Sequence, residues 1–177
     1  MEPDSDLARL VSAARAGSED AWRRLIEAHQ ARLMRLAWAL TGDRELAAEA
    51  TQECFVEAFI RIRQLREPRA FSVWLRTILV RTAQRWRARP KAAQEKETED
   101  PRTPEDELAG KELRAAVDRA LAQLPAAARQ ALALAMDGAL SSAEAAAILG
   151  CSPEAYRVRL HKARKHMREQ LAEFLEE

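Results

Sequence analysis

Apolar residues recur at helical spacing through most of this chain, and short polar or glycine-containing turns separate the runs. In the first half the pattern predicts helices near residues 5–16, 19–40, 44–64 and 69–88. The breaks have local causes, because Ser18 suits an N-cap, a Thr-Gly-Asp sequence follows the second helix, and Pro68 closes the third. No run of alternating β-branched residues is long enough for a strand. We therefore expect an all-α fold.

Each of the longer helices in the first half has one apolar face, which we expect to form a core. In the third helix this face consists of Leu46, Ala50, Cys54, Phe55, Ala58, Phe59 and Ile62. The fourth helix begins with an apolar face of the same kind and then becomes basic in the string RTAQRWRARPK. Trp86 continues the apolar arc, which favours core or edge packing, while stacking on a nucleic-acid base is the alternative.

The segment 140–169 predicts two further helices joined by a glycine turn. Ser141 and Glu144 have the spacing of a capping box, in which each side chain satisfies a free amide at the helix start. Gly150 follows the apolar residues of this short helix, where a left-handed residue would end it. Ser152 and the proline after it suit the N-cap and the first position of a second helix.

The second of these helices is basic on every side but one. Its apolar stripe consists of Tyr156, Leu160, Ala163 and Met167. No acidic residue occurs between Tyr156 and Arg168. A helix of this charge, packed by one stripe on a short capped helix, suits insertion into the major groove of DNA. The alternative is an amphipathic helix whose charges face only solvent, but the order of capped helix, glycine turn and capped helix favours DNA binding.

Charge is sorted into blocks along the chain, although the formal net charge of the 177 residues is only +1. Residues 76–91 carry only basic charges, whereas acidic residues crowd the next stretch, which also holds two prolines and almost no large apolar residue. Such a stretch is typical of an exposed linker between two domains. The cations before it would repel one another, so we expect a polyanion, and phosphate contact, at Arg81, Arg85 and Arg87.

Several classes of protein are disfavoured by what the sequence lacks. No apolar segment approaches the length of a membrane span, and the first ten residues do not resemble a signal peptide, so we expect a cytoplasmic protein without a membrane span. Cys54 and Cys151 lie far apart and outside any metal-ligand spacing with histidine, which favours reduced, structural thiols. We therefore expect no metal and no other cofactor.

The sequence also favours a protein that is not an enzyme. It contains no phosphate loop, zinc-ligand cluster or nucleophile elbow, and no histidine has a convincing catalytic companion. His161 and His166 belong with the basic helix, and we expect His29 at a surface.

Four segments of the chain follow one another in an order that is specific as a set. They are ELAAEATQECFVEAF, AFSVWLRTI, LPAAARQALALAMDG and LSSAEAAAILGCSPEAYRVRLHKAR. The first two resemble regions 2.2 and 2.3–2.4 of the bacterial RNA polymerase sigma factors of the extracytoplasmic-function (ECF) group. The last two resemble the start and the helix-turn-helix of sigma region 4. The resemblance covers most of the chain.

The resemblance implies two small helical domains, region 2 at residues 1–90 and region 4 at 108–177, joined by an acidic flexible linker at 91–107. It implies an alternative sigma factor that binds core RNA polymerase and directs promoter recognition, promoter melting and transcription initiation. It also implies an anti-sigma factor as a partner, and we expect a monomer when the protein is free of its partners.

The resemblance further implies roles for individual residues. Core RNA polymerase would contact Glu49, Gln52 and Glu53. The unwound minus-10 element of promoter DNA would lie near Arg66, Arg69, Ser72, Arg81 and Arg85. The minus-35 element would be read by Pro153, Glu154, Arg157, Val158, His161 and Lys162.

This chain departs from the family at several of these positions. Arg81 stands where an Asn is usual, and Arg85 replaces an Asp, so we expect phosphate contacts in place of polar base contacts. Ala155 and Val158 stand where Thr and Ser are common, which favours apolar contact with a thymine methyl. Two other functions stay open: a regulator that binds duplex DNA through the C-terminal helices alone, and a sigma-like protein that binds polymerase or an anti-sigma factor without initiating transcription.

Overall fold

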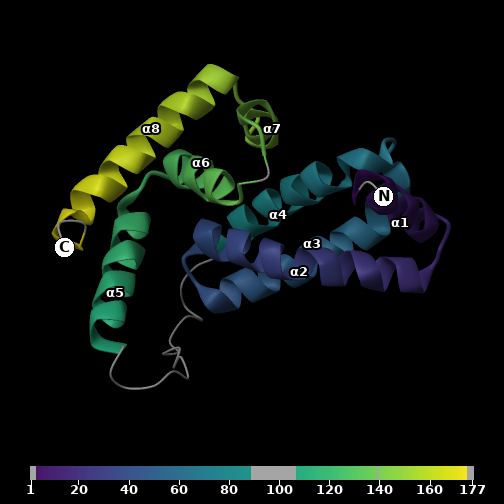
Figure 1. Ribbon diagram of the computed structural model, residues 1–177, viewed down its shortest axis with the longest axis horizontal. Coiled ribbons are helices and arrows are strands. Elements are labelled where there is room, and N and C mark those ends of the chain that lie inside the picture. Colours follow the sequence, from purple (N-terminus) through teal and green to yellow (C-terminus); the bar gives the residue numbers. More distant parts are fainter. Residues whose placement is uncertain (1–2, 89–106, 139, 175–177) are drawn as a thin grey trace.

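The computed structural model describes residues 3–88, 107–138 and 140–174. Every regular element in these ranges is a helix, which confirms the all-α prediction, and the helices form two units (Figure 1). The predicted linker, residues 91–107, falls outside the described residues except for its last position.

The N-terminal unit contains four α-helices and two short 3₁₀ helices. These are α1 (Pro3–Arg15), α2 (Glu19–Thr41), α3 (Arg44–Arg61), η1 (Ile62–Gln64), η2 (Pro68–Ala70) and α4 (Phe71–Arg87). The four predicted helices are confirmed, with changes at the ends. The third tightens into a 3₁₀ turn for its last three residues, and the fourth begins after a 3₁₀ turn that starts at the proline.

Local capping fixes where these helices begin and end, as the sequence predicts. The Ser18 hydroxyl accepts a hydrogen bond from the Ala21 amide, and the Asp43 carboxylate accepts one from the Leu46 amide at 2.9 Å. Between them Gly42 ends α2 with a φ of 73°, a left-handed conformation that favours glycine.

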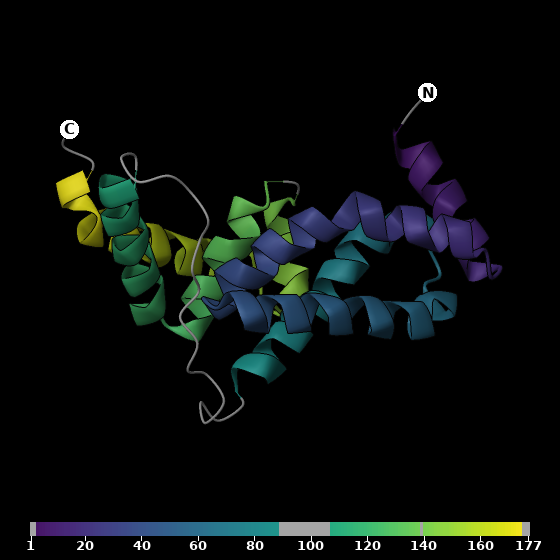
Figure 2. The ribbon, with the colours of Figure 1, turned by 90° about the horizontal axis from the view of Figure 1, so that it is seen from below.

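Helices α2, α3 and α4 pack together around the core of this unit, and α2 and α3 run side by side (Figure 2). The fully buried side chains include Leu25, Cys54, Phe71, Leu75, Leu79 and Thr82. The Thr82 hydroxyl donates to the carbonyl oxygens of both Leu79 and Ala50, which satisfies a buried polar group between two helices. Burial raises the pKa of the Cys54 thiol, as expected of a structural cysteine.

The C-terminal unit contains α5 (Glu107–Gln123), α6 (Ala126–Met136), α7 (Ser142–Ile148), α8 (Pro153–Gln170) and η3 (Ala172–Phe174). The predicted capping box at Ser141 and Glu144 is present in both directions. Gly150 adopts the predicted left-handed conformation with a φ of 61°, and the Ser152 hydroxyl caps α8. The two capped helices and the glycine turn are therefore confirmed.

A buried arginine joins α5 to α6. The Arg129 side chain donates hydrogen bonds to the carbonyl oxygens of Leu121, Ala122 and Leu124 at 2.7, 3.1 and 2.7 Å. Two of these carbonyls belong to the last turn of α5 and the third to the residue after it, and a cation is favoured at this end of a helix.

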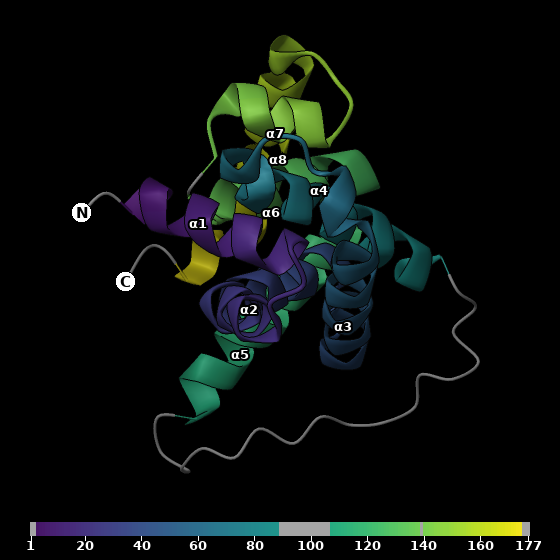
Figure 3. The same cartoon turned by 90° about the vertical axis from the view of Figure 1, so that its right-hand side faces the viewer.

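The two units pack against each other, which the sequence did not predict. Helix α6 contacts α2, and α7 lies over α4 (Figure 3). Buried apolar residues of α6 and α7, such as Leu134 and Ala146, belong to the same core cluster as Leu25 and Leu79 of the N-terminal unit. The contact between the units is therefore partly a continuous apolar core.

Candidate nucleic-acid interface

Helix α8 is held in place by the apolar stripe that its sequence predicts. Tyr156 and Ala163 are buried, while Leu160 and Met167 are partly buried against the neighbouring core. The Tyr156 hydroxyl also donates to the carbonyl oxygen of Ala131 on α6, at 3.4 Å. This side of α8 is therefore committed to packing.

The other side of α8 carries the six residues predicted to contact duplex DNA, and all are exposed: Pro153, Glu154, Arg157, Val158, His161 and Lys162. Their spacing puts most of them on one helix face. The Arg157 guanidinium contacts Glu154 at 2.9 Å, but both side chains are largely in solvent, so the ion pair is weak. His166 lies apart from this face and contacts the Ala120 carbonyl on α5.

The cations at the end of α4 were expected to need a polyanion from outside the protein, but Arg85 has acidic partners within the fold. The Arg85 guanidinium contacts the carboxylates of Glu53 at 2.9 Å and Glu57 at 3.3 Å, both on α3. The Trp86 indole donates to the other oxygen of Glu53 at 2.6 Å and packs partly buried against the core. Edge packing of Trp86 is therefore confirmed, and the argument from mutual repulsion is wrong for Arg85, because acids distant in sequence are its neighbours.

The residues predicted to lie near the minus-10 element do not form one compact cluster. Arg66 and Arg69 are exposed in and near the turn before α4, and Arg81 is exposed on α4. Ser72 lies in the first turn of this helix and Arg85 in its last. At a rise of about 1.5 Å per residue these two positions are about 20 Å apart. A ligand that touched all of them would have to extend along the helix.

His29, expected at a surface, is instead half-buried between α2 and α4. One ring nitrogen contacts the Leu25 carbonyl at 2.9 Å, the other contacts the Ser72 hydroxyl at 3.2 Å, and the ring meets Phe71 edge-on. Burial lowers the pKa of His29, and the nearby cations Arg76 and Arg32 lower it further. His29 therefore links a predicted DNA-contact residue to the neighbouring helix.

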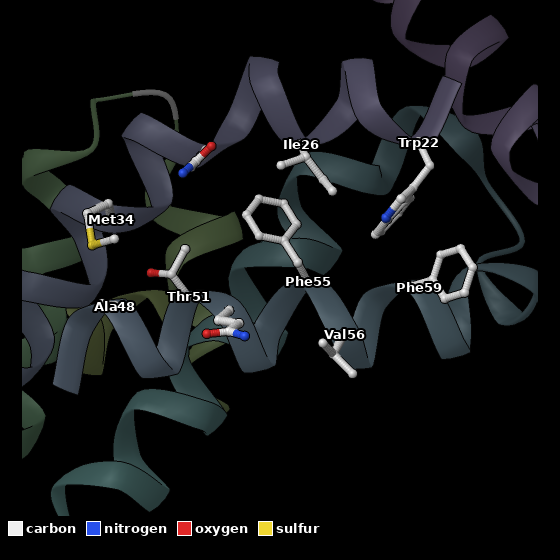
Figure 4. Close-up of a pocket in the computed structure, with 10 residues that line it drawn as sticks. Trp22, Ile26, Met34, Ala48, Thr51, Phe55, Val56 and Phe59 are labelled. Carbon is white, nitrogen blue, oxygen red and sulfur yellow. The ribbon is translucent and has the colours of Figure 1, made fainter. Parts of the chain in front are cut away.

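The residues predicted to bind polymerase lie on α3 beside an apolar groove. Glu49 and Gln52 are exposed, whereas Glu53 is bonded to α4 as described above. The groove has a volume of about 660 Å³ and runs between α2 and α3 (Figure 4). Its lining includes Trp22, Phe55, Val56 and Phe59 as well as Gln52.

The groove was missed in the sequence because its residues match the pattern of a core face. Phe59 was expected in the core, but more than half of its side chain is exposed, and it meets Trp22 at a ring separation of 5.4 Å. Val56 and Ile60 next to it are also exposed. A run of large apolar side chains that reaches past the predicted stripe was the available signal.

Two further properties of the described residues bear on function. None of their helices is long and apolar enough to cross a bilayer. Within the same part of the chain, no group of three or more histidine, cysteine, aspartate or glutamate side chains is arranged to hold a metal ion.

Family models match both units of the chain. Residues 25–92 match Sigma-70 region 2, and residues 114–167 match Sigma-70, region 4. The two matches follow the order of the resemblance seen in the sequence.

Two relatives agree with these matches. The chain is 32% identical over 169 residues to the probable RNA polymerase sigma factor RfaY of Xanthomonas campestris pv. campestris, covering 89% of this chain and 42% of the relative. It is 34% identical over 160 residues to the ECF RNA polymerase sigma factor SigE of Mycolicibacterium smegmatis, covering 85% of this chain and 62% of the relative. The chain thus spans about half the length of these two relatives.

Two solved structures share the fold. CnrH, in complex with the cytosolic domain of CnrY, superimposes with a TM-score of 0.74 at 23% identity, covering 94% of this chain and 97% of that chain. The sigma factor RpoE, in complex with the anti-sigma factor NepR from Bartonella quintana, gives a TM-score of 0.66 at 21% identity, covering 85% and 96%. Both comparisons agree with the all-helical arrangement of the two units.

Proposed function

Because this chain belongs to the extracytoplasmic-function group of the sigma-70 family, we propose that it is an alternative sigma factor. It would bind core RNA polymerase and direct promoter recognition, promoter melting and transcription initiation. The observation that carries the proposal is the presence of both sigma regions in one chain, at residues 25–92 and 114–167. The N-terminal unit is called region 2 below, and the C-terminal unit region 4, with the proposed boundaries at 1–90 and 108–177.

The proposed minus-35 contact is the exposed face of α8. Arg157, His161 and Lys162 would lie against phosphates and base edges in the major groove, and Val158 would meet a thymine methyl. Support comes from the packing of the opposite side of α8, because a helix seated by Tyr156 can present this face without rearrangement.

The proposed minus-10 contact follows α4 and the turn before it. Arg66, Arg69 and Arg81 are exposed and would approach the backbone of an unwound strand. Ser72 and Arg85 would first exchange their partners within the protein for DNA. Melting would be favoured because captured unpaired bases contribute about 1–3 kcal/mol each through stacking.

The proposed polymerase contact combines polar and apolar side chains of α3. Glu49 and Gln52 would give it polarity, and the exposed Val56 and Phe59 beside the groove would give it apolar area. Polymerase would then hold both regions, so that two weak DNA contacts act as one bivalent interaction.

The same proposal includes the protein's other properties. An anti-sigma factor is its proposed regulator, by analogy with the RpoE complex with NepR. The protein would act in the cytoplasm, without a cofactor and without catalysing a reaction itself, and would be a monomer when free of partners.

The decisive experiment is run-off transcription with the purified chain, core polymerase and genomic fragments. Specific transcripts that require the chain are the expected result. A footprint on duplex DNA without polymerase, and no transcripts, would instead indicate a regulator that uses the C-terminal helices alone. Binding to polymerase with no transcripts would indicate a sigma-like interaction protein.

A further inference from the structure

One carboxylate of region 4 is held by two guanidinium groups of region 2. Asp137 follows the last residue of α6, and its side chain is only 2% exposed. One oxygen accepts a hydrogen bond from Arg32 on α2 at 2.6 Å, and the other accepts one from Arg76 on α4 at 2.5 Å. A second Arg32 nitrogen donates to the Asp137 backbone carbonyl at 2.8 Å.

The position of Asp137 is not explained by helix stability. It lies at the C-terminal end of α6, where the helix dipole disfavours a carboxylate. The residue before it, Met136, is largely exposed, and Gly138 after it is left-handed with a φ of 69°. The two arginines of region 2 therefore provide the favourable interactions of this carboxylate.

The two arginines differ in burial, and the difference shows what would happen if region 4 moved away. The Arg76 side chain is 4% exposed and also donates to the Ser72 carbonyl, whereas the Arg32 side chain is 44% exposed. A buried cation needs an anionic partner. Without Asp137, two neighbouring cations would face solvent and attract another anion.

A second acidic group of region 4 faces the same place. The pKa of Glu144 on α7 is lowered, first by the hydrogen bonds of the capping box with Ser141 and to a smaller extent by the charge of Arg76. Region 4 thus brings both Asp137 and Glu144 toward cations of region 2 while α6 and α7 pack on it.

The arginine pair adjoins a residue already proposed to lie near unwound promoter DNA. Arg76 is bonded to the Ser72 backbone, and the Ser72 hydroxyl contacts His29. We propose that Arg32 and Arg76 form a phosphate-binding pair for single-stranded DNA, and that Asp137 occupies this pair when region 4 is packed on region 2. Closure of the two regions and capture of a phosphodiester are then mutually exclusive. The inference rests on the proposed sigma function for the identity of the DNA.

The first test measures DNA binding by the full chain without polymerase. The probe is a fluorescein-labelled single strand of 15 thymidines, followed by anisotropy at low salt. Asp137→Asn removes the competing charge with little change in shape, so its affinity for the probe is expected to rise about tenfold, as more of the protein becomes competent to bind. In the double variant Asp137→Asn with Arg32→Gln this gain is lost.

A matched control separates the site from net charge. Glu169→Gln removes the same charge from region 4, but in the ion pairs of the described residues Glu169 is paired with Lys165 of its own helix, at 3.8 Å. Its affinity for the probe should stay within about twofold of the wild type, a change that the loss of a surface charge can produce. An equal gain in Glu169→Gln and Asp137→Asn would overturn the proposal.

The second test measures the separation of the regions by electron paramagnetic resonance. Spin labels at Glu45→Cys on α3 and Lys165→Cys on α8, in a Cys151→Ser background, report the distance between the two units. The probe strand, or Asp137→Asn, should broaden this distance toward longer values. An unchanged distance together with unchanged probe affinity in Asp137→Asn would refute the proposed competition between Asp137 and DNA.

Run-off transcription keeps this inference apart from the proposed function. Transcripts from the wild type, with no gain in probe affinity in Asp137→Asn, would overturn the competition between Asp137 and DNA and leave the proposed sigma function in place. Separation of the two regions and tighter probe binding in Asp137→Asn, with no transcripts from either protein, would support the competition between Asp137 and DNA and overturn the sigma function.

Discussion

The basic helix α8 and the basic end of α4 look alike in the sequence but differ in the folded protein. The exposed face of α8 has acidic neighbours only from its own helix in the ion pairs of the described residues, such as Glu154 beside Arg157. On α4, in contrast, Arg85 contacts Glu53 and Glu57 of α3, and Arg76 contacts Asp137 of the other region. The charge available to a ligand therefore depends on tertiary neighbours and not on the run of cations alone.

This difference has an energetic consequence for the two proposed DNA contacts. Solvent screens exposed ion pairs such as Arg157–Glu154, so α8 can exchange them for phosphates at small cost. The Arg76–Asp137 pair is buried on both sides, and a buried ion is strongly disfavoured when its partner leaves. In this arrangement the proposed DNA-binding face of region 4 is exposed, whereas part of the proposed DNA contact of region 2 is bonded within the protein.

The largest expected effect comes from removing the packing that makes the α8 face available. Tyr156→Ala should destabilise region 4 by about 3–5 kcal/mol, the usual cost of deleting a large buried aromatic side chain. Urea unfolding followed by circular dichroism measures this loss. Val158→Ala, on the exposed face of the same helix, should change stability by less than about 0.5 kcal/mol. Equal effects of the two variants would contradict the division of α8 into a packed and an open face.

The next effect concerns the open face itself. In holoenzyme assembled with core polymerase, Arg157→Ala and Lys162→Ala should each weaken promoter binding and make its salt dependence shallower by about one unit of slope. The slope of log affinity against log salt concentration is the measurement. Arg9→Ala, at an exposed ion pair on α1, serves as the control and should leave it unchanged. A slope equal to that of the wild type would remove either residue from the interface.

A smaller effect of opposite sign is expected on α4. Glu53→Ala removes one of the two carboxylates that Arg85 contacts, together with a hydrogen-bond acceptor of Trp86. Single-stranded DNA should therefore bind about threefold more tightly, the equivalent of one surface ion pair. The assay uses the full chain without polymerase, because Glu53 is itself a proposed polymerase contact. Glu49→Ala, one turn earlier on the same helix, is the matched control. Weaker binding by Glu53→Ala would show that this carboxylate does not compete with DNA.

The features that could be predicted from the sequence are those decided within a few residues. The capping box of Ser141 with Glu144, the left-handed Gly150 and the N-cap Ser152 each depend on neighbours three or four positions away. Helix periodicity likewise predicted that Tyr156 would be buried. For such features the chain itself holds both partners close together.

The features that could not be predicted join residues far apart in the chain. Asp137 meets Arg76 across 61 positions and Arg32 across 105 positions, and no local pattern specifies either pairing. The exposed Phe59 shows a related limit, because periodicity identifies an apolar face but not what covers it. The roles of the individual contact residues stay predictions, and the packing of region 4 on region 2 had to come from the structure.

The smallest expected effect is a pH dependence of stability that comes from His29, which is packed between α2 and α4. Its folded pKa lies below the ordinary value of 6.5, mainly because burial disfavours the charged ring. As the pH falls below 6.5, His29 is protonated in the unfolded chain before it is protonated in the folded protein. The free energy of unfolding therefore decreases as the pH falls from 6.5 to the lower pKa of the folded state. The free energy of unfolding in urea should therefore decrease from pH 7.5 to 6.5 to 5.5, values about one unit apart around the ordinary pKa of histidine.

The matched variants decide whether this pH dependence belongs to His29. His29→Gln carries no titrating ring and should flatten the stability profile between these pH values, although it also loses the packing against Phe71. His161→Gln, on the exposed face of α8, should keep the wild-type profile. If the stability profile of His29→Gln were as steep as that of the wild type, the pH dependence would come from another group and not from the histidine packed against α4.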